Sequence, residues 1–140
     1  MRRIAEMSSE HEQSIKKRII IEHLKELLEE EISEAGSRIV KAIIAEQEGS
    51  IKAASVLREI AYNEAKHAVL IAKVLPDNPF ADTRANIQSS IEGDSDAAQR
   101  ENDFARIANE AGMEDIAKLF EQLSLEEKEH VARLKEVLAG

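Results

Sequence analysis

Apolar residues recur along this chain at spacings of three and four, which is the repeat of an amphipathic α-helix. Alternating apolar and polar residues, typical of a half-buried strand, are not found. Gly49 and Gly112 stand where helices commonly end, and the run Pro76-Asp77-Asn78-Pro79 cannot continue a helix. The first helical segment either runs without interruption or breaks early, before Ile19. Ser8 and Ser9 are candidate N-caps for its start. The pattern therefore predicts four helices, over residues 9–48, 51–75, 82–111 and 114–138.

The second half of the chain repeats the first with an offset of 63 residues. Gly49 corresponds to Gly112, and an apolar stripe recurs on the helices that follow these two glycines. The stripe consists of Leu57, Ile60 and Ile71 in the first half and Phe120, Leu123 and Leu134 in the second. The fold class is therefore predicted to be all-α, a four-helix bundle made of two pseudo-symmetric helical hairpins.

Each repeat carries a Glu-x-x-His motif, Glu64 to His67 and Glu127 to His130. Residues at i and i+3 of a helix project from one face, so each pair can bind one metal ion. Both pairs fall on the apolar stripe, where an isolated ionised carboxylate is strongly disfavoured unless a cation accompanies it. We therefore favour metal binding, although exposed surface pairs in a metal-free helical interaction module are the alternative.

The partner helices should each supply a further carboxylate. Glu31 lies at a depth similar to that of Glu64 when both are counted from the turn at Gly49, and the offset of 63 carries Glu31 to Asp94. Glu92 competes with Asp94 as the ligand on the third helix, and a run of glutamates around Glu31 is also typical of a solvated face.

Composition and charge narrow the classes of protein. The chain has 140 residues, no cysteine and a net charge of −9. The charge argues against nucleic acid or an anionic membrane as a partner, and the lack of cysteine excludes iron–sulfur clusters and thiolate catalysis. No apolar run is long enough for a membrane span, and no apolar segment follows the first residues, so we expect a cytoplasmic protein. We predict a bundle domain over residues 19–140, with residues 1–18 as an N-terminal extension or extra helix.

At the residues Gln47-Glu48-Gly49 through His67, and Ala111-Gly112-Met113 through His130, the chain resembles the rubrerythrin branch of the ferritin-like superfamily. The resemblance covers roughly residues 20–138 and implies a di-iron peroxidase that reduces hydrogen peroxide, with manganese or a mixed metal pair as an alternative. It implies the following ligands: Glu64 and Glu127 bridge the two metals, Glu31 and Asp94 are terminal carboxylates, and His67 and His130 each bind one metal.

Two departures from the family pattern carry further expectations. The family has an extra carboxylate three residues after the third-helix ligand, where this chain has Ala97, and we hypothesise that its repeat counterpart Glu34 takes that role. The family also commonly bears a cysteine-ligated iron domain, which this chain lacks, so a separate electron-donor protein is expected. A ferroxidase or iron-binding protein is the alternative function. The short connection over residues 76–82 predicts a homodimer, with hairpins exchanged between two chains as one form of it.

Overall fold

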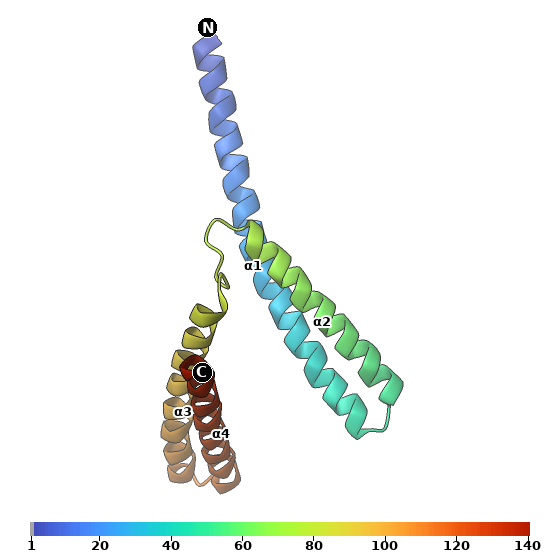
Figure 1. Cartoon of the computed structure of the whole chain (residues 1–140), viewed down its shortest axis with the longest axis vertical. Coiled ribbons are helices and arrows are strands. Elements are labelled where there is room, and N and C mark those ends of the chain that lie inside the picture. Colours follow the sequence, from blue (N-terminus) through green and yellow to red (C-terminus); the bar gives the residue numbers. More distant parts are fainter. Residues whose placement is uncertain (1) are drawn as a thin grey trace. The chain divides into compact units, whose positions relative to one another are not determined.

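The computed structural model describes residues 2–140, with side chains from Ser9 onward, and it contains four α-helices (Figure 1). Over these residues the backbone forms no strand, which confirms the predicted all-α class. The chain divides after Pro79 into two compact units, and each unit is a hairpin of two antiparallel helices. The helices are α1 (Arg2–Gln47), α2 (Ile51–Val74), α3 (Thr83–Glu110) and α4 (Glu114–Ala139).

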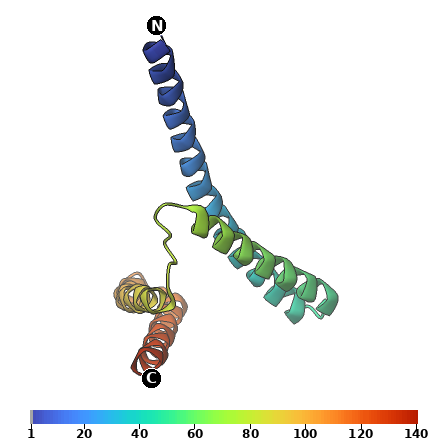
Figure 2. The same cartoon turned by 45° about the horizontal axis from the view of Figure 1, so that its top comes forward.

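The first helix is longer than the sequence pattern indicated. It runs without interruption from Arg2 to Gln47, so the early break before Ile19 is wrong, and Ser8 and Ser9 lie inside the helix rather than at its start. Neither glycine nor proline interrupts α1 before Gly36, which explains its continuity. Its N-terminal part continues beyond the end of α2 (Figures 1 and 2), and residues 9–20 are all exposed. The domain boundary at residue 19 stays a prediction.

The two hairpin turns have the same backbone structure. Gly49 and Gly112 adopt φ angles of 80° and 75°, a left-handed conformation that glycine enters without steric cost. At the first turn, the amide of Ser50 donates to the carbonyl of Ala45 at 2.8 Å. At the second, the amide of Met113 donates to the carbonyl of Ala108, also at 2.8 Å. These are the bonds of a Schellman motif, and they end α1 and α3 at corresponding positions of the repeat.

The remaining helix starts differ from one another. Ser50 occupies the N-cap position of α2, but its side chain makes no capping hydrogen bond. At the start of α3, the side chain of Asp82 accepts a 2.8 Å hydrogen bond from the amide of Ala85. That bond satisfies one of the free amides of the first helical turn. It places the start of α3 where the sequence indicated.

Small residues form the contact between the two helices of each hairpin. Ala42, Ala54 and Ala61 are at most 1% exposed in the first hairpin, and Ala117 and Ser124 are each 1% exposed in the second. Further buried alanines continue both contacts, and we call this line of small side chains the alanine seam: Ala42, Ala45, Ala54, Ala61, Ala68, Ala72, Ala98, Ala105, Ala108, Ala117 and Ser124. Side chains this small let two helices pack closely.

The larger apolar residues lie beside the alanine seam. Ile60 and Leu123, which the sequence pattern assigned to the packed stripe, are 38% and 37% exposed on their hairpins. Leu28 and Leu75 are buried, and they close the end of the first hairpin that is remote from Gly49. Each hairpin by itself therefore leaves most of its bulky apolar side chains available for further packing. Within the described part of the chain, no helix is both long and apolar enough to cross a bilayer.

Candidate metal centre

Three carboxylates come together in the first hairpin. Glu31 and Glu34 lie one turn apart on α1, and Glu64 faces them from α2. One oxygen of each carboxylate lies within 4.8 Å of an oxygen of the other two. Glu64 is only 5% exposed, Glu31 is partly buried and Glu34 is exposed. The structure therefore places the predicted ligands Glu31 and Glu64 side by side, with Glu34 next to them.

Two oxygens of this cluster are buried without a hydrogen bond. Among the residues that the structure describes, Oε2 of Glu31 and Oε2 of Glu64 have no donor within hydrogen-bond distance. A buried carboxylate oxygen left in this way costs free energy unless a cation or a proton accompanies it. Oxygen donors of this kind, together with imidazole nitrogen, suit iron, manganese and similar divalent ions. The residues present therefore fit a bound metal ion.

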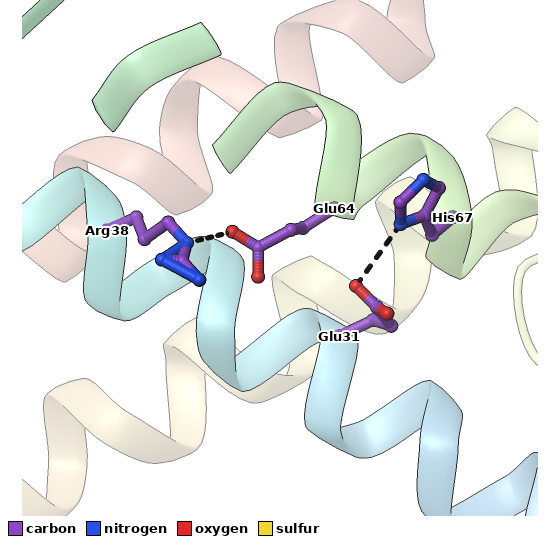
Figure 3. Close-up of polar contacts among 4 residues, drawn as sticks. All are labelled: Glu31, Arg38, Glu64 and His67. Atoms are coloured by element: carbon purple, nitrogen blue, oxygen red, sulfur yellow. Dashed lines mark hydrogen bonds and ion pairs between the residues drawn. The ribbon is translucent and has the colours of Figure 1, made fainter. Parts of the chain in front are cut away.

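Two further side chains contact this cluster, as Figure 3 shows. Nε of Arg38 on α1 donates a hydrogen bond to Oε1 of Glu64. Nδ1 of His67 on α2 lies 3.6 Å from Oε2 of Glu31, so the predicted histidine sits over one end of the cluster. The side chain of His67 is 58% exposed on the hairpin, whereas the sequence pattern assigned it to the buried stripe with Glu64. Within the hairpin the contact with α1 is made by the alanine seam and Glu64, so the burial of His67 in a bundle stays a prediction.

The second hairpin carries the corresponding group. Asp94 on α3 and the pair Glu127 and His130 on α4 place one ligand atom each within 4.8 Å of the others. Nδ1 of His130 lies 3.7 Å from Oε2 of Glu127, and the His130 side chain is 52% exposed. Glu92, the alternative to Asp94, is exposed, and α3 passes through Gly93 as regular helix. The structure therefore brings Asp94 to the motif residues of α4.

The two groups are related by the repeat. Glu31, Glu64 and His67 correspond to Asp94, Glu127 and His130, and both hairpins draw one carboxylate from the first helix and a Glu-x-x-His motif from the second. Ala97, the counterpart of Glu34, adds no ligand to the second group. Together the two groups hold all seven predicted site residues, and their role as metal ligands stays a prediction.

Sequence reasoning missed two polar residues of these hairpins. One is Arg38, whose position in the repeat corresponds to Glu101, and the charge reversal at this pair was the signal that could have revealed it. The other is Ser124, whose hydroxyl donates a 2.8 Å hydrogen bond to the carbonyl of Ala98 across the second hairpin. Its counterpart is Ala61, so a polar residue replaces a small apolar one in the repeat.

Comparisons with known proteins find sequence similarity to rubrerythrins. Residues 85–140, which cover all but the first two residues of the second hairpin's helices, match the rubrerythrin family model. Reverse rubrerythrin-1 of Clostridium acetobutylicum is 25% identical over 119 residues, which are 85% of this chain and 66% of that protein. Rubrerythrin of Nitratidesulfovibrio vulgaris is 31% identical over 101 residues, covering 64% of this chain and 53% of that protein. The chain thus spans between about half and two thirds of the length of these relatives. Over its second hairpin the chain is similar to the rubrerythrin family.

Proposed function

We propose that this chain is a dinuclear non-haem iron oxidoreductase that reduces hydrogen peroxide with electrons from a separate donor protein. The observation that supports it most directly is the pair of buried oxygens on Glu31 and Glu64 that lack a hydrogen-bond donor among the described residues. In the other hairpin, Asp94, Glu127 and His130 occupy the positions that correspond to Glu31, Glu64 and His67. The likeness to rubrerythrins supports a di-iron oxidoreductase in general, and the reduction of peroxide is our more specific proposal.

The chain's own residues would hold the ions and shape their surroundings. Glu31, Glu64 and His67 from the first hairpin, with Asp94, Glu127 and His130 from the second, would provide six ligands, and Glu34 an additional carboxylate. The iron ions, when bound, would supply the change in oxidation state, which the carboxylate and imidazole side chains of the clusters do not provide. Glu64 lies beside the alanine seam, which keeps water from one side of its carboxylate.

Metal content and its response to peroxide test the proposal. Purified chain loaded anaerobically with ferrous iron should retain about two ions per chain, as the six-ligand arrangement of di-iron bundles implies. Its visible spectrum should change on addition of peroxide and return on reduction. Glu64→Ala and Glu127→Ala should each lower iron content, whereas Glu30→Gln should leave it unchanged because Glu30 is exposed and lies outside both clusters. A wild-type chain that retains no iron would contradict the proposal.

The same loaded protein separates peroxide reduction from the alternative of iron oxidation and storage. A peroxidase consumes successive equivalents of peroxide when a reductant is present and keeps its iron content constant. A ferroxidase instead accumulates ferric iron well beyond two ions per chain. We expect the first result, since the described ligands account for a small fixed number of ions.

We further propose that two copies of the chain associate, with hairpins exchanged between them as one form of the dimer. The proposal rests on the bulky apolar side chains that each hairpin leaves exposed, such as Ile43, Ile60 and Leu119. Such surfaces are normally covered in a stable soluble protein. The connection between α2 and α3 is also short, from Leu75 to Asp82. Light scattering coupled to gel filtration should give twice the chain mass, and a monomer at all concentrations would count against it.

A further inference from the structure

Arg38 places a fixed positive charge inside the first carboxylate cluster. It follows Glu31 by seven residues, or about two helical turns, so both side chains project from the same side of α1. Its side chain is 33% exposed, and its Nε donates to Oε1 of Glu64, whose side chain is 7% exposed (Figure 3). A charge-assisted hydrogen bond to a buried carboxylate is stronger than a bond between neutral groups.

The two oxygens of Glu64 therefore have different surroundings. Oε1 is held by Arg38, whereas Oε2 is buried and has no donor among the described residues. Three carboxylates and one guanidinium share this small volume. Without a bound ion, Arg38 is the cation that makes the buried charge of Glu64 tolerable.

The second hairpin lacks this arrangement. The counterpart of Arg38 is Glu101, whose carboxylate lies 3.3 Å from Nε of the adjacent Arg100, a side chain that is 61% exposed. The charged contact found for Glu127, the counterpart of Glu64, is His130 at 3.7 Å. The two halves of the repeat thus share one carboxylate and a Glu-x-x-His motif. They differ at Glu34, whose counterpart is Ala97, and in the sign of the charge at Arg38 and Glu101.

We infer that Arg38 is a positioning residue that holds Glu64 through Oε1 and competes with metal ions for this carboxylate, an inference that rests on the proposed function. While the guanidinium stays in place, Glu64 offers a metal ion Oε2 alone. A metal that takes both oxygens of Glu64 has to displace Arg38 from Oε1. Arg38 therefore stabilises the metal-free hairpin and weakens metal binding to it.

Replacing the arginine should separate these two effects. In Arg38→Gln the buried carboxylate loses its cation, so the urea midpoint of the metal-free protein in EDTA should fall. The same variant should bind cobalt(II) about tenfold more tightly, a gain of about 1.4 kcal/mol, because the competing charge is gone. Cobalt(II) is the probe because it is stable in air and its visible absorption reports on the ligands. Arg38→Lys keeps the charge without the guanidinium, so its cobalt affinity should fall between those of the wild type and Arg38→Gln.

Arg58→Gln is the matched control in the same hairpin. Arg58 pairs with Glu46 at 2.7 Å, but both side chains are exposed and lie outside the cluster. Its cobalt affinity and urea midpoint should match those of the wild type, because exposed ion pairs contribute little. Circular dichroism at 222 nm verifies that each variant is folded before titration, and Arg38→Lys carries the comparison if Arg38→Gln is not folded.

The outcomes distinguish this inference from the proposed function. Unchanged or weaker cobalt binding in Arg38→Gln would overturn the competition between Arg38 and the metal ion, and the same holds for Arg38→Lys if that variant has to be used instead. If the wild type still binds cobalt tightly in that case, the proposed metal site is not affected. A wild-type chain that binds no cobalt would overturn the proposed function and the competition together. An unchanged urea midpoint in EDTA would overturn the stabilising role of Arg38 whatever the cobalt result.

Discussion

Replacing Glu31 by glutamine should stabilise the metal-free protein and weaken its metal site. In the first cluster, Oε2 of Glu31 is buried without a hydrogen-bond donor among the described residues. This oxygen lies 3.6 Å from Nδ1 of His67, and the Glu31 carboxylate lies close to that of Glu64. Glutamine has nearly the same shape, removes one negative charge and adds an amide group that can donate a hydrogen bond. In the metal-free state the change relieves repulsion and provides a donor for Oε2 of Glu64.

The size of the effect follows from the separation of the charges. Two like unit charges 4.8 Å apart, the limit found for oxygens of this cluster, repel each other by about 3.5 kcal/mol at an effective dielectric constant of about 20. Arg38 already offsets part of this repulsion, and the Glu31 side chain is 18% exposed, so solvent screens another part. We therefore expect the free energy of unfolding to rise by about 1 to 2 kcal/mol, which raises Tm by about 3 to 8 °C for a chain of this length.

Thermal and urea unfolding in low-salt buffer with EDTA measures this gain. Glu30→Gln is the control, because it removes the same charge from the neighbouring exposed position. The ranking should reverse with metal: at a cobalt(II) concentration one hundred times Kd, binding should stabilise the wild type by about 2.7 kcal/mol, and Glu31→Gln by much less. Glu31→Gln that unfolds at or below the temperature of Glu30→Gln in EDTA would refute the reasoning, since the cluster would then carry no repulsion to relieve.

Three further predictions concern single positions. Ser124→Ala should lower the free energy of unfolding by about 1 kcal/mol in urea titrations, because it removes the buried bond to the carbonyl of Ala98; no loss would show that the bond contributes nothing. Gly93→Ala should stabilise the protein by about 1 kcal/mol, because alanine favours the helix and no atom lies within 4 Å of the added methyl group. Gly112→Ala should destabilise the protein by about as much, because Gly112 has a φ of 75°, and calorimetry should therefore give Tm shifts of opposite sign for the two variants. Glu34→Ala should slow peroxide turnover and leave iron content mostly intact if Glu34 is the extra carboxylate, and unchanged turnover would remove that role.

The repeat made most of the candidate centre predictable from sequence. Gly49 and Gly112 fixed the two turns, and the positions of Glu64 and Glu127 relative to them placed one motif in each hairpin. On the third helix, the offset of 63 favoured Asp94 over the neighbouring Glu92, and the structure brings Asp94 to the motif on α4. Helix spacing and the repeat suffice to predict these positions because both can be read directly from the order of residues in the chain.

Packing within the hairpins was harder to predict. Both the alanine seam and the stripe that includes Leu57 and Ile60 recur at spacings of three and four, so periodicity alone does not tell which one faces the partner helix. Arg38 is hard to identify from sequence because its contact with Glu64 crosses from one helix to another, and arginine is not a metal ligand. Interactions of this kind depend on how the helices rotate about their axes, which composition and spacing leave open.

Contacts made of single methyl groups have a consequence for how mutations reach the carboxylates. Ala42 in the first hairpin and Ala105 in the second are at most 4% exposed, so the added atoms of a bulkier residue at either position would lie between the two helices. The two helices of that hairpin would have to move apart. The opposing carboxylates would separate with them, Glu31 from Glu64 in the first hairpin and Asp94 from Glu127 in the second. These two alanines of the seam therefore control the distance between the opposing carboxylates, although they lie several helical turns away from them.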